Sequence, residues 1–500
     1  MCVGVPRALI PLVATAIGTP IVLAAQAHVP ADLQLQQADG FVREGRFSDA
    51  AAAYRYILGA PSADAVRERA QAGLTLSLLR TGDFAGARKE GARLGARPGA
   101  SAGSLALYGD SLWSSGLFDE AERAYSTSLT RDPGEPRAHH GRARSLTARG
   151  RFDEALLEAR QAIAGAPDEA EFHHLLGFIY ERQRRFGDAA AAFAEYVARL
   201  PDHDHSPTAL WARSEIRFLH AFDRVTPVDF AGANGTRDSW TIPIRIEKGK
   251  VFVRAKVNGD PIDFVLDTGA EQTVLSGDAA VRRGVNPAAY TESAGVGDAG
   301  RRGLQVGRIA RLQLGDLDVR NVPCLIKNPP LSGFVAREPE SLSPLALGLS
   351  MTIDYTRRLL TMARVLPDAP HAIELPLRMY RLATVRGFVN GAPASFIVDT
   401  GGQWISISRA TAEQVTTEGD YRRIPLKVYG TSGWDKDAFL MPNVDLTFDA
   451  LHLPRVPVVV LNLTAPSTLL GYQVGGIVGH SLLSKYRVTF DLNRGVLGLD

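Results

Sequence analysis

The hydrophobic and polar residues follow different patterns in the two halves of the chain. Between residues 31 and 222 the apolar positions recur at helical spacing, in segments rich in Ala, Arg, Glu and Leu. From residue 237 onward short segments such as 240–246 and 251–257 alternate apolar and polar residues between glycine turns. Such alternation is typical of antiparallel sheets and barrels. The chain is therefore predicted to be multidomain, all-α first and all-β second, with a linker at 223–236.

The helical half repeats a six-residue motif centred on Phe. Successive Phe positions are 37, 34, 34 and 34 residues apart. Small residues recur at Gly109, Ala143 and Gly177, where paired helices would approach closely, and a helix-stopping proline closes each repeat. A 34-residue period of two amphipathic helices is typical of tetratricopeptide repeats, and the motif resembles that family closely. The five Phe residues are Phe47, Phe84, Phe118, Phe152 and Phe186.

The resemblance implies a short solenoid of five repeats over 31–222, with 209–222 as its final capping helix. Such a solenoid usually presents a concave face to a peptide or a protein partner. A plain spacer that holds the second domain at a distance is the alternative. His139-His140 and His173-His174 lie 34 residues apart and so occupy the same repeat position. Repeat geometry explains these histidines, and no metal site is expected.

The β-rich half contains one sequence motif twice. Residues 257–269 and 389–401 agree at eight of thirteen positions, including all of Asp-Thr-Gly. Each copy predicts a hairpin turn at Asn-Gly, an apolar strand, and an acidic residue at a tight turn. The duplication predicts two related lobes, each with one carboxylate on a rigid loop.

The duplication continues beyond the Asp-Thr-Gly motif. Two apolar residues and a Gly follow at 346–348 and at 477–479, each before a strand that ends in Asp. This half resembles the retropepsin-like aspartic proteases, in the form with two lobes in one chain. The resemblance implies an all-β acid protease domain, with lobe 1 at 237–365 and lobe 2 at 366–500. It also implies that each apolar-apolar-Gly motif packs under its own Asp-Thr-Gly loop.

Paired carboxylates explain why the chemistry needs these residues. Two carboxyl groups held close together cannot both ionise, so one retains a proton. The ionised group can take a proton from water while the other donates to the scissile carbonyl oxygen. Asp267 and Asp399 are the expected catalytic dyad. Thr and Gly are expected to support the two loops, by hydrogen bonds across the junction and by backbone freedom: Thr268, Gly269, Thr400 and Gly401.

Glycine-rich segments follow both loops by about thirty residues. Residues 295–300 resemble the flap hairpin of retropepsins, and 428–433 are the matching segment of lobe 2. The segment 295–300 also fits G-x-G-x-x-G, but no strand precedes it and β alternation follows it, so a dinucleotide site is not expected. The expected substrate-binding flap residues are Gly295, Val296, Gly297, Tyr429 and Gly430.

Composition adds limits on location and partners. The net charge of +2 gives no reason to expect a nucleic acid partner. Residues 1–27 have the form of a secretory signal peptide, with Arg7, an apolar run and small residues at the exit. Export to the periplasm or outside the cell is expected, an uncleaved membrane anchor being the alternative. A cleaved chain keeps one cysteine, Cys324, so neither an internal disulfide nor a cysteine metal site is expected.

Two departures from the family pattern affect these expectations. Lobe 2 has Gly402 where a small Ala is usual, and only six residues separate Gly348 from Asp354, so the short helix expected there is missing. Neither change removes a catalytic group. The predicted function is an exported aspartic endopeptidase without cofactor or metal, active as a monomer on a peptide or protein substrate, with repeats that recruit protein. A non-catalytic peptide-binding protein that keeps the cleft is the alternative.

Overall fold

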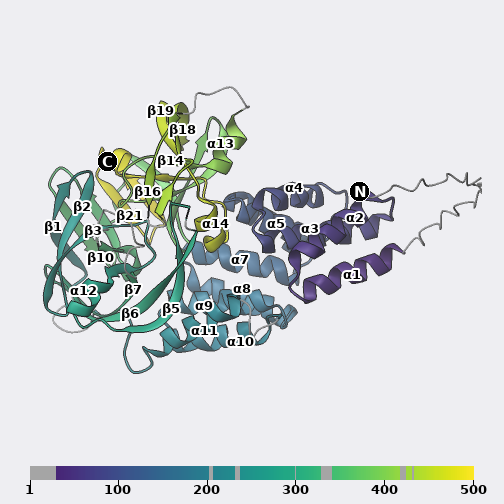
Figure 1. Cartoon of the computed structure of the whole chain (residues 1–500), viewed down its shortest axis with the longest axis horizontal. Coiled ribbons are helices and arrows are strands. Elements are labelled where there is room, and N and C mark those ends of the chain that lie inside the picture. Colours follow the sequence, from purple (N-terminus) through teal and green to yellow (C-terminus); the bar gives the residue numbers. More distant parts are fainter. Residues whose placement is uncertain are drawn as a thin grey trace, which may run out of the picture.

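A computed structural model of the chain describes residues 30–201, 207–230, 237–298, 300–327, 340–416, 424–430 and 433–500. The expected signal peptide at 1–27 lies outside these residues. Figure 1 shows helices from the first half on the right and sheets from the second half on the left. Among the described helices, none combines the length and apolar character that crossing a bilayer requires.

The first half consists of consecutive helices packed in pairs. The second helix of each pair begins at the motif Phe, and the residue two positions earlier turns the chain with a positive φ. Four copies have Gly there, with φ between 73° and 78°, and Arg184 takes the position with φ 61° in the fifth. The helices are α1 (Ala31–Arg43), α2 (Phe47–Gly59), α3 (Asp64–Thr81), α4 (Phe84–Gly95), α5 (Ala102–Ser114), α6 (Phe118–Arg131), α7 (Pro136–Ala148), α8 (Phe152–Gly165), α9 (Ala170–Arg182), α10 (Phe186–Ala198) and α11 (Pro207–His220).

The recurrent small residues lie where paired helices touch. A Cβ atom on Gly109 would lie 2.4 Å from the ring of Tyr125, and one on Gly177 would lie 2.8 Å from the ring of Phe193. Both distances are far below van der Waals contact, so a larger residue would force the helices apart. The expected role of these glycines in helix pairing follows directly from this packing.

The histidine pairs belong to the repeat scaffold. Nε2 of His139 lies 2.8 Å from the carbonyl oxygen of Pro133, and Nε2 of His173 lies 2.9 Å from that of Pro167. Both histidines therefore bond to the proline six residues earlier, in two successive repeats. Within the described residues, no group of three or more His, Cys, Asp or Glu side chains could hold a metal ion.

The second half consists of two β lobes. Lobe 1 contains β1 (Ser239–Glu247), β2 (Lys250–Val257), β3 (Asp260–Leu266), β4 (Thr273–Ser276), α12 (Gly277–Arg282), β5 (Pro287–Ala294), β6 (Arg301–Leu314), β7 (Leu317–Lys327), β8 (Ser341–Leu342), η1 (Leu345–Leu347), β9 (Ser350–Asp354) and β10 (Leu359–Ala363). Lobe 2 contains β11 (Ile373–Met379), β12 (Ala383–Val389), β13 (Ala392–Val398), β14 (Ser406–Ser408), α13 (Arg409–Val415), β15 (Ile424–Pro425), β16 (Val428–Gly430), β17 (Gly433–Asp435), β18 (Phe439–Phe448), β19 (Leu451–Leu461), α14 (Thr464–Leu470), β20 (Gly476–Val478), α15 (His480–Leu483), β21 (Val488–Asp491) and β22 (Val496–Leu499).

The two lobes repeat the same strand pairings. The antiparallel pairs β2–β3 and β6–β7 of lobe 1 correspond to β12–β13 and β18–β19 of lobe 2. The parallel pairs β3–β8 and β4–β7 correspond to β13–β20 and β14–β19. The duplicated sequence thus folds into duplicated topology, and the strands that precede Asp267 and Asp399 are equivalent.

An antiparallel sheet of six strands joins the lobes, in the order β1-β10-β9-β21-β22-β11. Its central pair takes one strand from each lobe, and Thr352 of β9 bonds to Thr489 of β21 with 3.0 Å between the hydroxyl oxygens. Apolar residues of both lobes pack around this sheet in one continuous core. The lobes are consequently held at a fixed separation.

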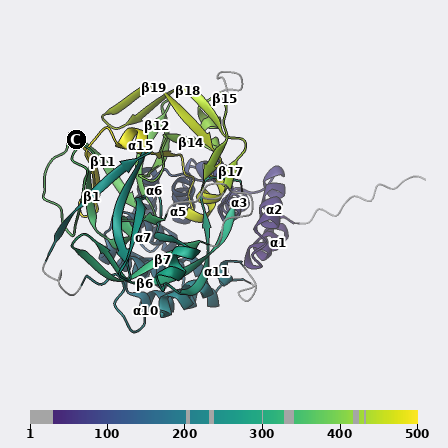
Figure 2. The same ribbon diagram turned by 60° about the vertical axis from the view of Figure 1, so that its left-hand side comes forward.

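The repeat region packs against both lobes, and Figures 1 and 2 both show α7, α10 and α11 close to the sheets. The ring of Tyr380, at the turn between β11 and β12, lies 5.5 Å from Trp113 of α5 and 4.9 Å from Phe178 of α9. One hydrophobic cluster joins α5 and α6 to lobe 2, and another joins α10 and α11 to β5 and β6. The parts of α5 and α9 around Tyr380 are therefore covered by the chain's own second lobe.

The expected linker, 223–236, is described only as far as residue 230, and that part packs on lobe 1. The Val228 N–H bonds to the Asn321 carbonyl at 3.0 Å, and Asp229 forms an isolated β-bridge with Arg320. Phe230 stacks on Trp240 with 6.1 Å between ring centroids. The expectation of a simple linker is therefore wrong for 228–230, because these residues contribute to the lobe's core.

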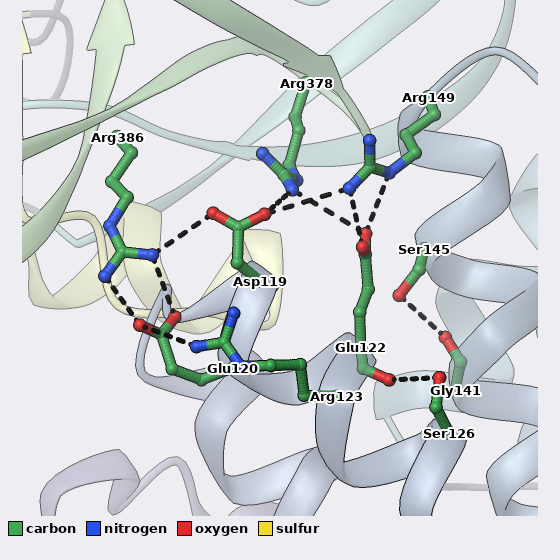
Figure 3. A network of polar contacts seen from close by, with 10 residues as sticks. All are labelled: Asp119, Glu120, Glu122, Arg123, Ser126, Gly141, Ser145, Arg149, Arg378 and Arg386. Carbon is green, nitrogen blue, oxygen red and sulfur yellow. Dashed lines mark hydrogen bonds and ion pairs between the residues drawn. The ribbon is translucent and has the colours of Figure 1, made fainter. Parts of the chain in front are cut away.

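A network of ion pairs fastens the repeat region to lobe 2 (Figure 3). Asp119 of α6 bonds to Arg378 of β11 and to Arg386 of β12, the latter at 3.2 Å. Glu120 bonds to Arg386 at 2.6 Å. Burial alone would raise the pKa of Asp119, but the two arginines outweigh burial and lower it. The Arg378 side chain is 6% exposed, so this part of the network lies largely out of water.

Candidate active site

The two Asp-Thr-Gly loops lie at the junction between the lobes. Asp267 directly follows β3 and Asp399 directly follows β13. The Asp267 N–H donates to the carbonyl of Leu342 at the end of β8, and the Asp399 N–H donates to that of Val478 in β20, both at 2.9 Å. Each aspartate is thus positioned by the same backbone interaction in its own lobe.

This geometry corrects the motif that was expected to support lobe 1. In lobe 2 the predicted segment 477–479 is the one beneath the loop, because Val478 pairs with Val398. In lobe 1 Leu342 pairs with Leu266, so the equivalent segment is 341–343 and not 346–348. A Gly is needed at 479, where a Cβ would lie 2.6 Å from a backbone oxygen. Ser343 holds the equivalent place, so this segment of lobe 1 lacks the apolar-apolar-Gly pattern.

The short helix thought to be missing from lobe 1 is present in a shorter form. With 341–343 as the supporting segment, the single 3-10 turn η1 stands where α15 stands in lobe 2. Both lobes therefore follow the same path from the supporting segment to the inter-lobe strands β9 and β21. The sequence-based expectation was wrong because it counted from Gly348, which ends η1 in a left-handed conformation.

The threonines of the two loops bind each other's loop. The Thr268 N–H donates to Oγ1 of Thr400 at 3.2 Å, and the Thr400 N–H donates to Oγ1 of Thr268 at 3.0 Å. Each hydroxyl then donates across the junction, Thr268 to the Val398 carbonyl at 2.6 Å and Thr400 to the Leu266 carbonyl at 2.8 Å. Both threonines are almost fully buried. These four bonds fix the two loops relative to one another.

The two carboxyl groups lie next to each other, and glycine makes their approach possible. A Cβ on Gly269 would lie 2.6 Å from Cγ of Asp399, and a Cβ on Gly401 would lie 2.6 Å from Cγ of Asp267. Any side chain at either position would therefore push the opposite carboxyl group away. The structure thus brings together Asp267, Asp399 and their predicted support residues.

The surroundings of the two carboxyl groups differ. Asp267 Oδ1 accepts one backbone N–H, from Gly269 at 3.0 Å. Asp399 Oδ1 accepts two, from Gly401 at 2.8 Å and Gly402 at 2.9 Å. Burial, then the neighbouring Asp399, raises the pKa of Asp267 to about 7. Burial also raises the pKa of Asp399, but the two N–H donors oppose this by stabilising its ionised form. These surroundings favour protonation of Asp267 over protonation of Asp399.

A cavity of about 1490 Å³ opens in front of the dyad. Its walls come from both lobes and from the repeat helices α9, α10 and α11. The lobes contribute Asp267, Asp399, the loop residues after each aspartate and apolar side chains of the strands. The repeat region contributes His174, Phe178, Glu181, Arg182, Phe193, Tyr196, Trp211 and Glu215.

The predicted flap segments meet over this cavity. Gly295, Val296 and Gly430 line it, and a Cβ on Gly430 would lie 2.3 Å from the Val296 carbonyl oxygen. Gly297 follows Val296 and is buried. The backbone of Tyr429 lies in β16, and its side chain falls outside the described part of the chain.

The tips of the two flaps are also joined by hydrogen bonds. The Asp298 N–H donates to the Trp434 carbonyl at 2.9 Å, and the Lys436 N–H donates to Oδ2 of Asp298 at 3.1 Å. Lobe 1 and lobe 2 are therefore connected above the cavity as well as below it.

Several cavity residues were not found from the sequence. Lys250 lines the cavity, and its charge favours the ionised form of both aspartates. Glu271, two residues after Gly269, bonds to Arg381 of lobe 2 at 2.8 Å. Gly402 was noted only as a departure from the family, whereas it supplies a second donor to Asp399. Lys250 carries no sequence signal, because a Lys at a strand end is ordinarily a solvated residue.

A doubled β domain with one Asp-Thr-Gly loop in each lobe has the architecture of an aspartyl protease domain. Residues 253–351 and 385–482 match the family model described as aspartyl protease. Residues 35–101, 108–169 and 141–204 match the model described as tetratricopeptide repeat. The chain is therefore a tetratricopeptide-repeat region followed by an aspartyl protease domain, and the fold class expected from the sequence is confirmed.

Several repeat proteins are among the solved structures similar to the chain. A thermophilic TPR protein of Thermus thermophilus is 19% identical with a TM-score of 0.33, over 38% of this chain and 100% of that one. YrrB, described as a TPR protein with an unusual peptide-binding site, is 17% identical with a TM-score of 0.22, over 37% and 92%. A tetratricopeptide repeat protein of Parabacteroides merdae is 15% identical with a TM-score of 0.30, over 39% and 74%. No curated protein matches the chain.

Proposed function

We propose that the protein is an aspartic endopeptidase in which Asp267 and Asp399 form the catalytic dyad. The observation that carries the proposal is that two carboxyl groups, one from each lobe, lie next to each other and line one large cavity. Two negatively charged carboxylates side by side repel each other strongly, so the pair holds one proton near neutral pH. A water molecule between the carboxyl groups and a peptide carbonyl would be activated there.

The unequal surroundings assign the roles of the two aspartates. Asp399, with two N–H donors, is the carboxylate that takes a proton from water. The water oxygen bonds to the carbonyl carbon, while Asp267 gives its proton to the carbonyl oxygen. Breakdown of this tetrahedral intermediate breaks the C–N bond, and a proton passes to the leaving nitrogen. Both aspartates return to their starting forms with one proton between them.

The test replaces each aspartate by Asn in the full chain. Asp267→Asn and Asp399→Asn should each abolish cleavage of a denatured protein at acid to neutral pH, while circular dichroism stays unchanged. Asp316→Asn, at an exposed surface position, is the matched control and should keep full activity. Undiminished cleavage by either dyad variant would refute the assignment. Peptide binding without any cleavage by the unmodified protein would favour the non-catalytic alternative.

Export is part of the same proposal. Residues 1–27 are read as a signal peptide, which would place both domains in the periplasm or outside the cell. Expression of the full chain followed by N-terminal sequencing of the exported product tests this location. A product that starts near residue 28 outside the cytoplasm supports cleavage, and a full-length product in the membrane fraction supports the uncleaved anchor.

A further inference from the structure

Two helices of the repeat region turn a face toward the dyad cavity. Four residues of α9 line the cavity, and three of them, His174, Phe178 and Glu181, lie at positions i, i+4 and i+7 of one helix face; the fourth is Arg182. On α11 the cavity residues are Trp211 and Glu215, at i and i+4. These side chains are all partly exposed, in contrast to neighbours that are fully buried between helices. Two adjacent helices thus present accessible side chains to the space in front of the catalytic loops.

The aromatic residues of this wall support one another. Trp211 lies 5.5 Å from His174 and 5.7 Å from Phe193, measured between ring centroids. Packed rings of this kind form a rigid surface that loses little conformational entropy when a ligand binds. Burial, with Arg381 and Arg80 nearby, lowers the pKa of His174 to about 4, so this ring is neutral.

The cavity wall next to Trp211 is also apolar. Trp211 packs in the same hydrophobic cluster as Val306 of β6 and Leu325 of β7, and both of these line the cavity. Burial raises the pKa of Glu181 to about 7 and, with Glu181 itself adding to the effect, that of Glu215 to about 8. Both carboxyl groups are therefore mainly uncharged in weakly acid solution. The arrangement favours an apolar group of a ligand in the part of the cavity that Trp211, Val306 and Leu325 line.

We propose that the repeat region completes the substrate site, and that Trp211 and Phe178 receive a large apolar side chain of a peptide bound across the dyad. The proposal rests on the proposed function and names its substrate class. Sites for small molecules usually have volumes of about 300–1,000 Å³. The cavity of about 1490 Å³ is larger, which suits an extended peptide segment. Trp211 and Phe178 are accordingly specificity-determining residues that come from outside the protease lobes.

The test compares Trp211→Ala with Leu210→Ala in the full chain. Leu210 is the neighbouring residue on α11, is 57% exposed and does not line the cavity. The substrates are two sets of otherwise identical peptides that carry either Phe or Ala at successive positions around the cleaved bond. Trp211→Ala should lower kcat/KM for the best Phe peptide about tenfold, while the matching Ala peptide changes less than about twofold. Leu210→Ala should change neither, and Trp211→Phe should restore most of the loss.

Two results would overturn the proposal. In the first, Trp211→Ala lowers kcat/KM equally for the Phe and Ala peptides, and Trp211→Phe does not restore it. This result would mean that Trp211 only supports the fold. Higher activity of Trp211→Ala on both peptides would mean that the helices obstruct the cavity. Thermal unfolding of each variant shows whether the substituted protein is folded when it is assayed.

A binding measurement separates this proposal from the proposed function. A fluorescein-labelled Phe peptide is titrated into Asp267→Asn and into Asp267→Asn combined with Trp211→Ala or Leu210→Ala. Only the Trp211 variant should bind about tenfold more weakly by fluorescence anisotropy. If the unmodified protein cleaves nothing but this difference persists, the proposed function fails and the repeat-region subsite stands. If all three variants bind the peptide with the same affinity, the proposed subsite is refuted, whether or not the unmodified protein cleaves peptides.

Discussion

Ser214 of α11 hydrogen-bonds both backbone polar groups of Tyr290 in β5. Its hydroxyl donates to the Tyr290 carbonyl and accepts the Tyr290 N–H at 3.1 Å. Because β5 and β6 form the hairpin that leads to the flap of lobe 1, one side chain of the repeat region fastens the outer strand of that hairpin. The position of the flap is thus linked to the position of α11.

Replacing Ser214 by Ala should loosen this strand. The carbonyl and N–H of Tyr290 would lose these part-buried bonds, which costs about 0.5–1.5 kcal/mol of unfolding free energy for each bond. Hydrogen exchange in residues 287–294 should accelerate, as measured by mass spectrometry. Ser126→Ala, which removes an exposed hydroxyl bonded within α6, is the control and should leave this exchange unchanged. Unchanged exchange in Ser214→Ala would show that the bonds do not restrain the hairpin.

The Arg378 network should hold the repeat region against lobe 2. Arg378→Ala removes a buried cation, while Asp119 keeps Arg386 and Arg149 as partners, so we expect a loss of about 1.5–3 kcal/mol in unfolding free energy. Arg151→Ala, which breaks an exposed pair within α8, should cost less than about 1 kcal/mol. Chemical denaturation of both variants provides the measurement. Equal stability of the two variants would contradict a role for the network in joining the domains.

Gly402→Ala should disturb the dyad through the backbone. A Cβ there would lie 2.7 Å from Oδ2 of Asp399, so the carboxylate must move or lose its N–H donor. Catalysis should fall by about a hundredfold, because misplacement of about 1 Å has effects of this size. Loss of the donor should also raise the pKa of Asp399 and move the acid limb of the pH–activity profile upward. Gly59→Ala, with no atom near its Cβ, should change neither quantity.

The raised pKa of Asp267 predicts a pH-dependent stability. Its value of about 7 in the folded state lies above the ordinary carboxyl value, so the folded protein binds the proton more tightly. This contribution to stability is fully present below about pH 4 and is lost as pH rises through about 7. Between about pH 4 and 7, the unfolding free energy of the unmodified protein should fall relative to that of Asp267→Asn, as urea titrations would measure.

The difference in unfolding free energy between the unmodified protein and Asp267→Asn reports on Asp267 and not on the other titratable groups facing the cavity. Glu181 and Glu215 also have raised pKa values, and they add a slope of the same sign to both proteins. An identical pH slope in the two proteins would contradict the assignment of the proton to Asp267. Besides Asp267, the acidic and basic side chains that face the cavity are His174, Glu181, Arg182, Glu215, Lys250, Glu271, Lys327, Arg381, Asp399 and Lys427.

One chain should suffice for activity, because both half-sites are joined covalently and through the inter-lobe sheet. Specific activity of the full chain should therefore stay constant on dilution. Light scattering over the same concentrations shows the state of association. A steep loss of activity on dilution, together with dissociation, would show that the site needs two copies.

The dyad and its support were predictable because they depend on short, local patterns that occur twice. Asp267, Thr268 and Gly269 carry the same identities as their lobe 2 counterparts, and a strand followed by a tight turn is specified locally. The supporting segment of lobe 1 was misassigned because Ser343, where lobe 2 has Gly479, breaks the pattern. The register of the strands shows that 341–343 is equivalent to 477–479. Register depends on pairing between residues distant in sequence.

The repeat-region wall could not be predicted for a different reason. Phe178 and Trp211 lie on helix faces whose apolar spacing is that of any amphipathic helix. Nothing local distinguishes a face that packs in a core from one that lines a cavity. Their role depends on how the solenoid docks on the lobes, and hence on contacts such as those of Tyr380 with Trp113 and Phe178.

The inter-lobe sheet has a consequence for the timing of maturation during synthesis. Its strands β21 and β22 are made 232 residues after Asp267, counted to Leu499, so a ribosome needs about 10–50 s more to produce them. Until then β9 and β11 lack their central partners, and the two Asp-Thr-Gly loops cannot be held together. The repeat helices, by contrast, are synthesised first and can fold beforehand. The proposed catalytic centre is therefore assembled last, on a surface that is already in place, and the growing chain lacks it until synthesis is almost complete.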